Sequence, residues 1–132
     1  MSELSIKPLG GVGQIGSNMT LYSEIKNSES IPLFCVDCGI LFPQDDCFGI
    51  NYLIPDFRDL SELKTLIITH GHEDHIGAIV HLLEKFPEIE IVASSFSHKI
   101  IKNKIGKKIK HIKKTLLENF KPISFGFTQV IP

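Results

Sequence analysis

The sequence of 132 residues has no tryptophan, a single arginine (Arg58) and only three cysteines. The cysteines are odd in number and lie in or near apolar sequence, which favours a reduced compartment over a disulfide framework. No apolar run approaches the roughly 20 residues that a membrane helix needs. Residues 1–7 lack the charged and then apolar form of a signal peptide. These absences predict a cytoplasmic protein with no membrane partner.

Basic residues are scarce in the middle of the chain, and acidic residues are scarce toward its C-terminus. From Asp37 to Glu90 there are eleven acids against three basic residues, and from Lys99 to Lys121 there are nine lysines against one acid. A hydrophobic content of 42% with 22% charged residues is typical of one ordinary globular domain. The lysine-rich segment either contacts phosphates or forms a solvated face, and the sequence leaves both interpretations open.

Four candidate metal ligands lie within six residues near the middle of the chain: His70, His72, Asp74 and His75. The short apolar run 66–68 before them predicts a buried strand. Apolar residues then recur at helical spacing over 76–86, up to Pro87, which predicts an amphipathic helix. The predicted order is therefore strand, ligand-bearing loop, helix.

These residue types at this spacing suit a divalent metal. In an extended segment residues i and i+2 point the same way, so His70 and His72 can reach one ion. Asp74 and His75, at the helix start, can turn toward a second position. Imidazoles with a carboxylate suit zinc, with manganese or iron as alternatives, and an open zinc site lowers the pKa of bound water to about 7. A solvated loop and a mononuclear iron site with two histidines and one carboxylate remain alternative interpretations.

Two motifs precede this stretch. The glycines of residues 11–16 match a dinucleotide-binding fingerprint, but alternation over 18–23 predicts a strand where the fingerprint requires a helix. With a strand predicted over 4–9, a hairpin with a glycine-rich turn is the better interpretation. The C-x-x-C motif at 35–38 begins on the predicted strand 31–36, whereas a redox pair usually begins a helix.

The long segment 39–60 predicts an irregular loop, in which Asp45 and Asp46 are interpreted as solvated turn acids rather than a paired-carboxylate site. The acid at the end of the preceding strand, Asp37, is predicted to support the ligand loop rather than to bind substrate. The remaining histidines have no ligand spacing, so we expect structural or surface roles for them: His81, His98 and His111.

Four further elements are predicted toward the C-terminus. They are a strand over 89–93, a helix from Ser94 or Ser95 to about 103, an amphipathic helix over 104–119 broken near Gly106, and a final strand or hairpin over 120–130.

The motif His70-x-His72-x-Asp74-His75 after an apolar strand resembles the signature of the metallo-β-lactamase fold, an αββα sandwich of mostly dinuclear metallohydrolases. Segments 9–19, 36–43, 49–56, 69–78 and 101–104, in this order, are similar to the N-terminal part of ribonuclease J, of the β-CASP group. The resemblance covers nearly the whole chain. It implies an α/β fold: the N-terminal half of the sandwich, with a mixed β-sheet and flanking helices.

This resemblance implies a metal-dependent ribonuclease that cleaves RNA phosphodiesters by a hydroxide held between two ions, Zn²⁺ with Mn²⁺ or Mg²⁺ as alternatives. His70 and His72 would hold one ion. Asp74 and His75 would hold the other and would also be catalytic. Asp37 would support the ligand loop, and the glycine-rich turn would lie near the rim of the site.

The family's site also needs later ligands, and its members carry an inserted domain that clamps RNA and a C-terminal region used in homo-oligomers. None of these lies within the 132 residues. We therefore expect residues 1–132 to be the N-terminal part of a metallo-β-lactamase domain, truncated before the later ligand motifs and nearly inactive alone. The alternative function is a non-catalytic remnant or interaction fragment of such an enzyme.

Overall fold

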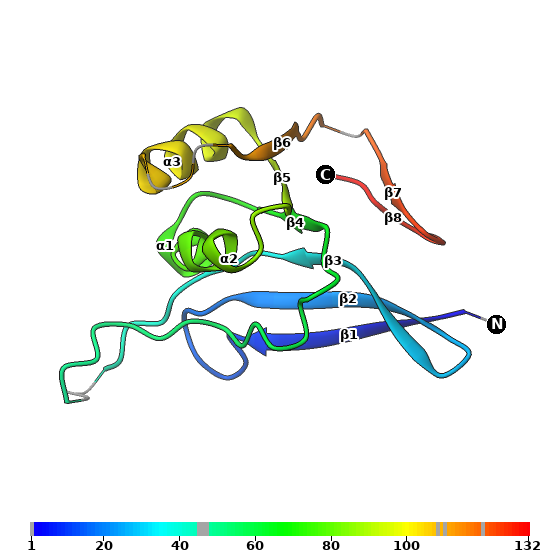
Figure 1. Ribbon diagram of the computed structural model, residues 1–132, viewed down its shortest axis with the longest axis horizontal. Coiled ribbons are helices and arrows are strands. Elements are labelled where there is room, and N and C mark those ends of the chain that lie inside the picture. Colours follow the sequence, from blue (N-terminus) through cyan, green and yellow to red (C-terminus); the bar gives the residue numbers. More distant parts are fainter. Residues whose placement is uncertain (1, 45–47, 108, 110, 120) are drawn as a thin grey trace.

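The computed structural model describes residues 2–44, 48–107, 109, 111–119 and 121–132. In these residues the chain forms a six-stranded mixed sheet of strand order β1-β2-β3-β4-β5-β6 and a separate two-stranded hairpin, β7-β8 (Figure 1). This arrangement confirms the predicted mixed α/β fold. None of the described helices is long and apolar enough to cross a membrane.

The N-terminal half of the sheet is an antiparallel meander. Strand β1 (Glu3–Gly10) pairs with β2 (Met19–Lys26), and β2 pairs with β3 (Glu29–Val36). Burial alternates along β2 because successive side chains point to opposite faces of the sheet. The strand predicted after the glycine-rich turn is confirmed. The dinucleotide-binding interpretation is therefore wrong, since no helix follows that turn.

The C-terminal half of the sheet is parallel. Strands β4 (Thr65–Ile67), β5 (Glu90–Ala93) and β6 (Lys113–Leu116) follow β3 in register, with Val36 opposite Ile67 and Ile67 opposite Val92. The helix predicted over 104–119 is wrong. Helix α3 (Ser95–Ile105) ends at Gly106, whose φ of +57° is left-handed, and the chain then extends to pair with β5. Pairing with the sheet edge outweighs the helical spacing of the isoleucines.

The helix predicted to end before Pro87 is present but divided. Helix α1 spans Glu73–Ile76 and α2 spans Ile79–Lys85. The carbonyl of Asp74 accepts hydrogen bonds from the backbone and side-chain nitrogens of Asn18, at 3.1 and 3.0 Å. The amide of Ala78, which would bond to that carbonyl in a continuous helix, donates instead to the carbonyl of Cys38 at 2.9 Å. A tertiary contact thus interrupts the helix.

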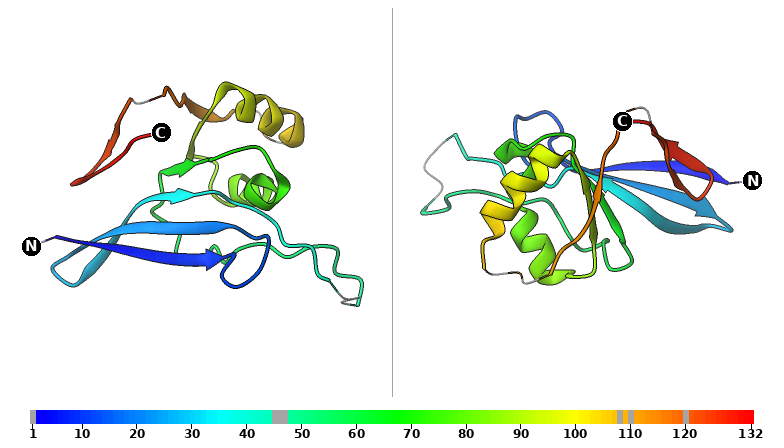
Figure 2. Two further views of the ribbon diagram at one scale, coloured as in Figure 1. Left: turned by 180° about the vertical axis from the view of Figure 1, so that it is seen from behind. Right: turned by 90° about the horizontal axis from the view of Figure 1, so that it is seen from above.

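The two faces of the sheet are covered differently. Helices α1, α2 and α3 and the segment around Phe57 and Leu60 pack on one face, over a core that includes Leu66 and Ile68. The opposite face carries a smaller cluster of Phe34, Ile67 and Val92, against which the hairpin of β7 (Ile123–Phe125) and β8 (Thr128–Val130) packs. Figure 2 shows the helices and this hairpin on opposite sides of the sheet. The predicted C-terminal hairpin is confirmed.

Candidate metal centre

The four predicted ligands follow strand β4 at the carboxyl end of the parallel strands. Asp37 follows the neighbouring strand β3 at the same edge of the sheet, with its amide donating to the carbonyl of Ile67 at 2.8 Å. This edge is where open α/β sheets usually place their sites. The structure therefore brings the ligand loop and the predicted supporting acid together.

The ligand side chains approach one another in two pairs. His70 Nε2 lies 3.1 Å from His72 Nδ1, and His75 Nε2 lies 3.3 Å from Asp74 Oδ2. Two donors bound to one tetrahedral zinc ion, at bonds of about 2.0 to 2.1 Å, lie about 3.3 Å apart. Each pair thus has the donor spacing of two ligands that share an ion. No group of three or more His, Cys, Asp and Glu side chains among the described residues is arranged to hold a metal.

The buried carboxylate of Asp37 holds the ligand loop in place through hydrogen bonds. It is 5% exposed and accepts hydrogen bonds from Thr69 N at 2.9 Å and Thr69 Oγ1 at 2.8 Å. Its Oδ2 also lies 2.8 Å from His75 Nδ1. Because a carboxylate only accepts, His75 carries its proton on Nδ1. In the neutral imidazole its Nε2 therefore presents a lone pair toward the carboxylate of Asp74, and the amide nitrogen of Asn18 lies 3.4 Å from both of these acceptors.

The same reasoning fixes the tautomer of His70. The hydroxyl of Thr69 has one proton, which it donates to Asp37, so it accepts from His70 Nδ1 at 3.0 Å. The Nε2 of His70 is then unprotonated and faces His72. A hydrogen bond from the second ring nitrogen to an oxygen acceptor is how proteins orient metal-binding imidazoles. The donor set therefore fits a divalent ion.

Asn18 is a residue of this centre that the sequence reasoning missed. Its Nδ2 donates to the Asp74 carbonyl and lies 3.4 Å from both Asp74 Oδ2 and His75 Nε2. The residue follows the glycine-rich turn, 56 positions before Asp74. Its position directly after that turn was the available signal, but only the paired fold shows that the turn returns to the ligand loop.

Close backbone packing also fixes the loop. A Cβ added at Gly39 would lie 1.6 Å from the carbonyl oxygen of Asp74, so only glycine fits there. On the other side, a Cβ at Gly71 would lie 2.6 Å from the side chain of Ile100 on α3. Lys104, one turn further along α3, forms a 2.7 Å ion pair with Glu73. The ligand loop is thus enclosed between the segment around Gly39, which follows β3, and helix α3.

Residues outside the centre have other partners. His81 Nε2 lies 2.9 Å from the hydroxyl of Tyr52, and His98 Nε2 lies 2.9 Å from the carbonyl of Thr115. His111 is exposed. The structural or surface roles predicted for these histidines agree with these contacts. The acids Asp45 and Asp46 lie outside the described residues.

The C-x-x-C thiols are buried in the core. Burial raises the pKa of Cys35 to about 12. Burial, together with the charges of Cys35 and Asp37, raises the pKa of Cys38 well above its ordinary value. Protonated, inaccessible thiols are poor nucleophiles, so a thioredoxin-like role is contradicted.

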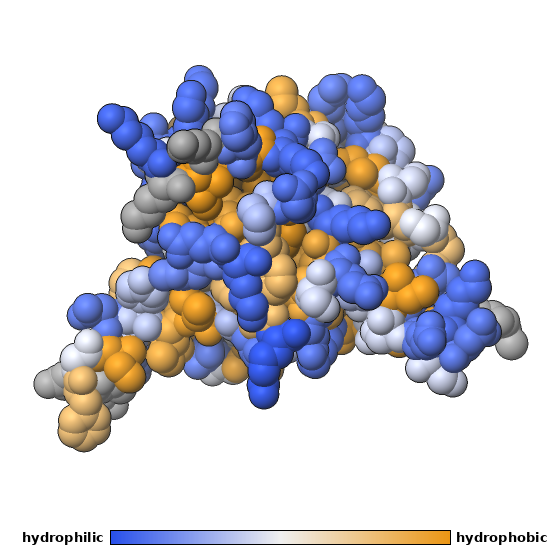
Figure 3. Space-filling view, in the orientation of Figure 1, coloured by the Kyte–Doolittle hydropathy of each residue, from blue (hydrophilic) through white to orange (hydrophobic). Residues whose placement is uncertain are grey.

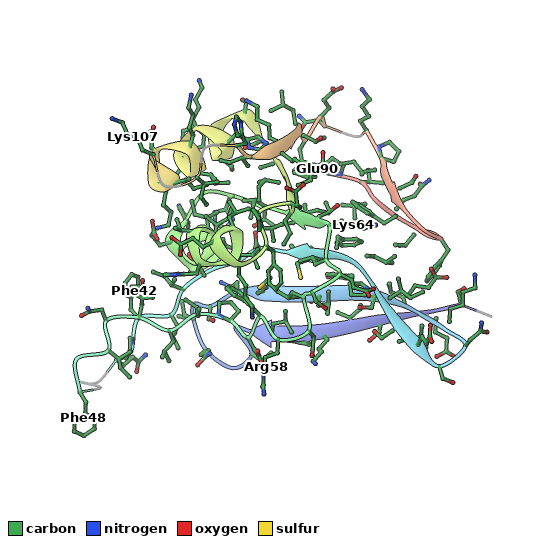
Figure 4. The ribbon with its side chains drawn as sticks, in the orientation of Figure 1. Phe42, Phe48, Arg58, Lys64, Glu90 and Lys107 are labelled. Atoms are coloured by element: carbon green, nitrogen blue, oxygen red, sulfur yellow. The ribbon has the colours of Figure 1, made fainter. Side chains whose placement is uncertain are left out.

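A loop with exposed apolar residues projects beside the centre. The bridge between Leu41 and Leu53 closes it at its base. Phe42 is 60% exposed and Phe48 is fully exposed, and Figure 4 shows Phe48 pointing away from the body of the protein. The long irregular loop predicted over 39–60 is confirmed for the part that the structure describes.

Proteins of the ribonuclease J type are similar to this chain in sequence. Ribonuclease J of Mycolicibacterium smegmatis is 41% identical over 105 residues, which are 76% of this chain and 18% of that protein. Ribonuclease J 1 of Streptococcus pyogenes is 40% identical over 116 residues, which are 80% of this chain and 20% of that protein. The chain thus spans about a fifth of the length of these relatives.

Solved structures share the fold at low sequence identity. A diphosphatase of the PhnP family superposes with a TM-score of 0.63 at 16% identity, over 98% of this chain and 56% of that one. A B3 metallo-beta-lactamase with an active-site glutamic acid gives 0.53 at 16% identity, over 94% of this chain and 49% of that one. The model of the metallo-beta-lactamase superfamily matches residues 36–125, which include the ligand loop and its supporting acid. The chain belongs to the metallo-beta-lactamase superfamily.

Proposed function

We propose that this chain is the part of a metal-dependent ribonuclease, of the ribonuclease J type, that supplies two ligands to each of two divalent ions. The observation that carries the proposal is the spacing of the two donor pairs. His70 with His72 and Asp74 with His75 each match the edge of a coordination tetrahedron, at 3.1 and 3.3 Å.

The residues of this chain would bind and orient. His70 Nε2 and His72 Nδ1 would hold one ion, and Asp74 Oδ2 and His75 Nε2 the other. Asp37 would keep the proton of His75 on Nδ1, away from the ion. When bound, zinc, or manganese or magnesium in its place, would supply Lewis acidity and a water of lowered pKa at neutral pH.

RNA is proposed as the substrate because the relatives at about 40% identity are named ribonuclease J. Cleavage of a phosphodiester would use the two sites to neutralise the attacking and leaving oxygens. Two donors for each ion leave further coordination positions to other groups, since zinc takes four ligands. Any protein ligand in the remaining coordination positions would be a residue other than His70, His72, Asp74 and His75.

A second candidate function is metal or RNA binding without cleavage. It is favoured by one observation: no group of three candidate ligands is assembled within the described residues. A catalytic zinc usually has three protein ligands and one open position. The two candidate functions use the same metal ligands, and they differ in whether the RNA is cleaved.

The test is zinc titration against a chelating dye, followed by incubation with end-labelled single-stranded RNA. We expect His72→Ala and His75→Ala each to lower the zinc affinity at least tenfold. Removing a metal ligand should weaken binding more than removing a group that only hydrogen-bonds to that ligand. The exposed histidine variant His111→Ala is the matched control and should bind zinc like the unmodified protein. Equal zinc affinity in all three variants would refute the metal assignment. Zinc binding without RNA cleavage would favour the second candidate.

A further inference from the structure

A basic groove lies between α3 and β6, outside the metal centre. It encloses about 400 Å³. Its lining combines Gly106 and four isoleucines, of which Ile101 and Ile105 are buried, with basic or imidazole side chains: Ile101, Ile105, Ile109, Ile112, His98, Lys102, His111 and Lys114. A site with an apolar floor and a few polar groups is the usual composition of a small-molecule or nucleotide pocket.

The segment that contributes the lining of this groove is rich in lysine and carries no acid in its sequence. Residues 99–117 contain eight lysines and no aspartate or glutamate. Lys104 and Lys113 pair with Glu73 and Glu88, from other parts of the chain. No salt bridge among the described residues involves the two lysines that line the groove, Lys102 and Lys114. Their ammonium groups are therefore available to an anion.

We propose that this groove binds one nucleotide of a single-stranded RNA, with a phosphate at Lys102 and Lys114 and the base against the isoleucine floor. The proposal rests on the proposed function, since it names a second contact of the same substrate. Lysines contribute sequence-independent affinity for phosphates, and a nucleobase offers a flat apolar face to a hydrophobic surface. A simple acidic peptide would use the lysines but not the isoleucines.

The groove lies close enough to the metal centre for one strand to reach both. Ile100 and Lys104, on one side of α3, contact the ligand loop at Gly71 and Glu73. His98 and Lys102, on the other side, line the groove. A helix with its side chains is about 10 to 12 Å across, and the groove and the ligand loop are therefore separated by roughly the width of α3. Figure 3 shows hydrophilic residues with hydrophobic patches between them over α3, and Figure 4 shows Lys107 pointing outward at its end.

The experiment measures binding of a fluorescent 12-nucleotide oligouridylate by anisotropy, in chelator, so that cleavage does not occur. The variant is Lys102→Gln with Lys114→Gln. The matched control removes the same charge elsewhere, as Lys26→Gln with Lys85→Gln, both exposed and outside the lysine-rich segment. Loss of the contacts to this one phosphate should lower the slope of log affinity against log salt by about 0.7 and weaken binding roughly tenfold at low salt. The control should change neither by more than twofold.

An abasic oligonucleotide of the same length tests the base contact. We expect it to bind the unmodified protein several-fold more weakly than oligouridylate and to bind the groove variant equally with it. Equal losses in the groove variant and the control, or equal binding of both oligonucleotides by the unmodified protein, would overturn the proposal. The proposal would also be overturned if the variant Lys102→Gln with Lys114→Gln bound RNA normally but no longer bound polyglutamate. Because the assay contains chelator and no metal, none of these outcomes depends on the metal centre. Circular dichroism of both variants verifies that they fold.

Discussion

Asp37→Asn is the substitution that most directly tests how the ligand loop is held. Asp37 has a φ of +62°, and asparagine tolerates this left-handed conformation better than most residues. The backbone is therefore left unstrained, and only the chemistry of the carboxylate changes. An alanine at the same position would add a backbone penalty and confuse the two effects.

The expected size follows from the contacts that are lost. The carboxylate accepts from Thr69 N, Thr69 Oγ1 and His75 Nδ1, all within 2.9 Å. An amide has one acceptor oxygen and two N–H donors, so at least one of the three donors will face another donor. A buried donor without its partner costs about 1 to 3 kcal/mol, and we expect the free energy of unfolding to fall by that amount.

The metal affinity should fall with it. Loss of an oxygen that orients a metal-binding imidazole typically lowers the affinity for metal by about 10- to 100-fold, or roughly 1.4 to 2.8 kcal/mol. The assay is competition between the protein and a chelating dye for zinc, with urea unfolding measured on the same samples. Asp59→Asn is the matched control, because this carboxylate is exposed and pairs with Lys7 at the surface, away from the ligand loop. Asp37→Asn behaving like Asp59→Asn in both assays would refute the reasoning.

Four further outcomes are expected. Gly39→Ala should cost about 3 kcal/mol of stability, measured by urea unfolding, because its Cβ would overlap the Asp74 carbonyl; a cost below 0.5 kcal/mol would contradict the packing. Asn18→Ala should cost about 1 kcal/mol in the same assay and also lower zinc affinity, and unchanged affinity would remove this residue from the centre. With Cys47 replaced by serine, the thiols of Cys35 and Cys38 should react with a thiol reagent at pH 8 only as the protein unfolds, and immediate labelling would show that they are accessible. Since the pKa of Cys35 is raised to about 12, its burial stabilises the fold fully below pH 9, and the free energy of unfolding should fall from there toward pH 12.

Local sequence patterns predicted the elements whose hydrogen bonds are local or whose side chains alternate. The strands around Leu21 and Ile67 and the helix capped by Ser94 lie close to their predicted positions, and Ser94 accepts from Ser97 N as a cap should. The ligand cluster was visible because four donors within six residues require no tertiary information. Its grouping as two pairs agrees with the predicted assignment of ligands, although the assignment to metal stays a prediction.

Two features depended on contacts between distant residues and were not predictable locally. Residues 113–116 have isoleucines before them at helical spacing, but they form an edge strand because β5 offers unpaired backbone groups there. The division of the helix at Ala78 arises from Asn18, far away in the chain, which takes the carbonyl that the helix would use. In both cases a tertiary hydrogen bond decides between conformations that are nearly equal in intrinsic preference.

The ligand loop emerges from the shortest strand at the middle of the sheet, and this position has a kinetic consequence. Strand β4 has only three residues, all buried, and is flanked by β3 and β5. Its amides, and that of Ile68 directly after the strand, which is bonded to the Val92 carbonyl, can exchange with solvent only when the centre of the sheet opens. Hydrogen–deuterium exchange at Ile68 should therefore be as slow as global unfolding, whereas the amides of the exposed edge strand β1 exchange through local fraying.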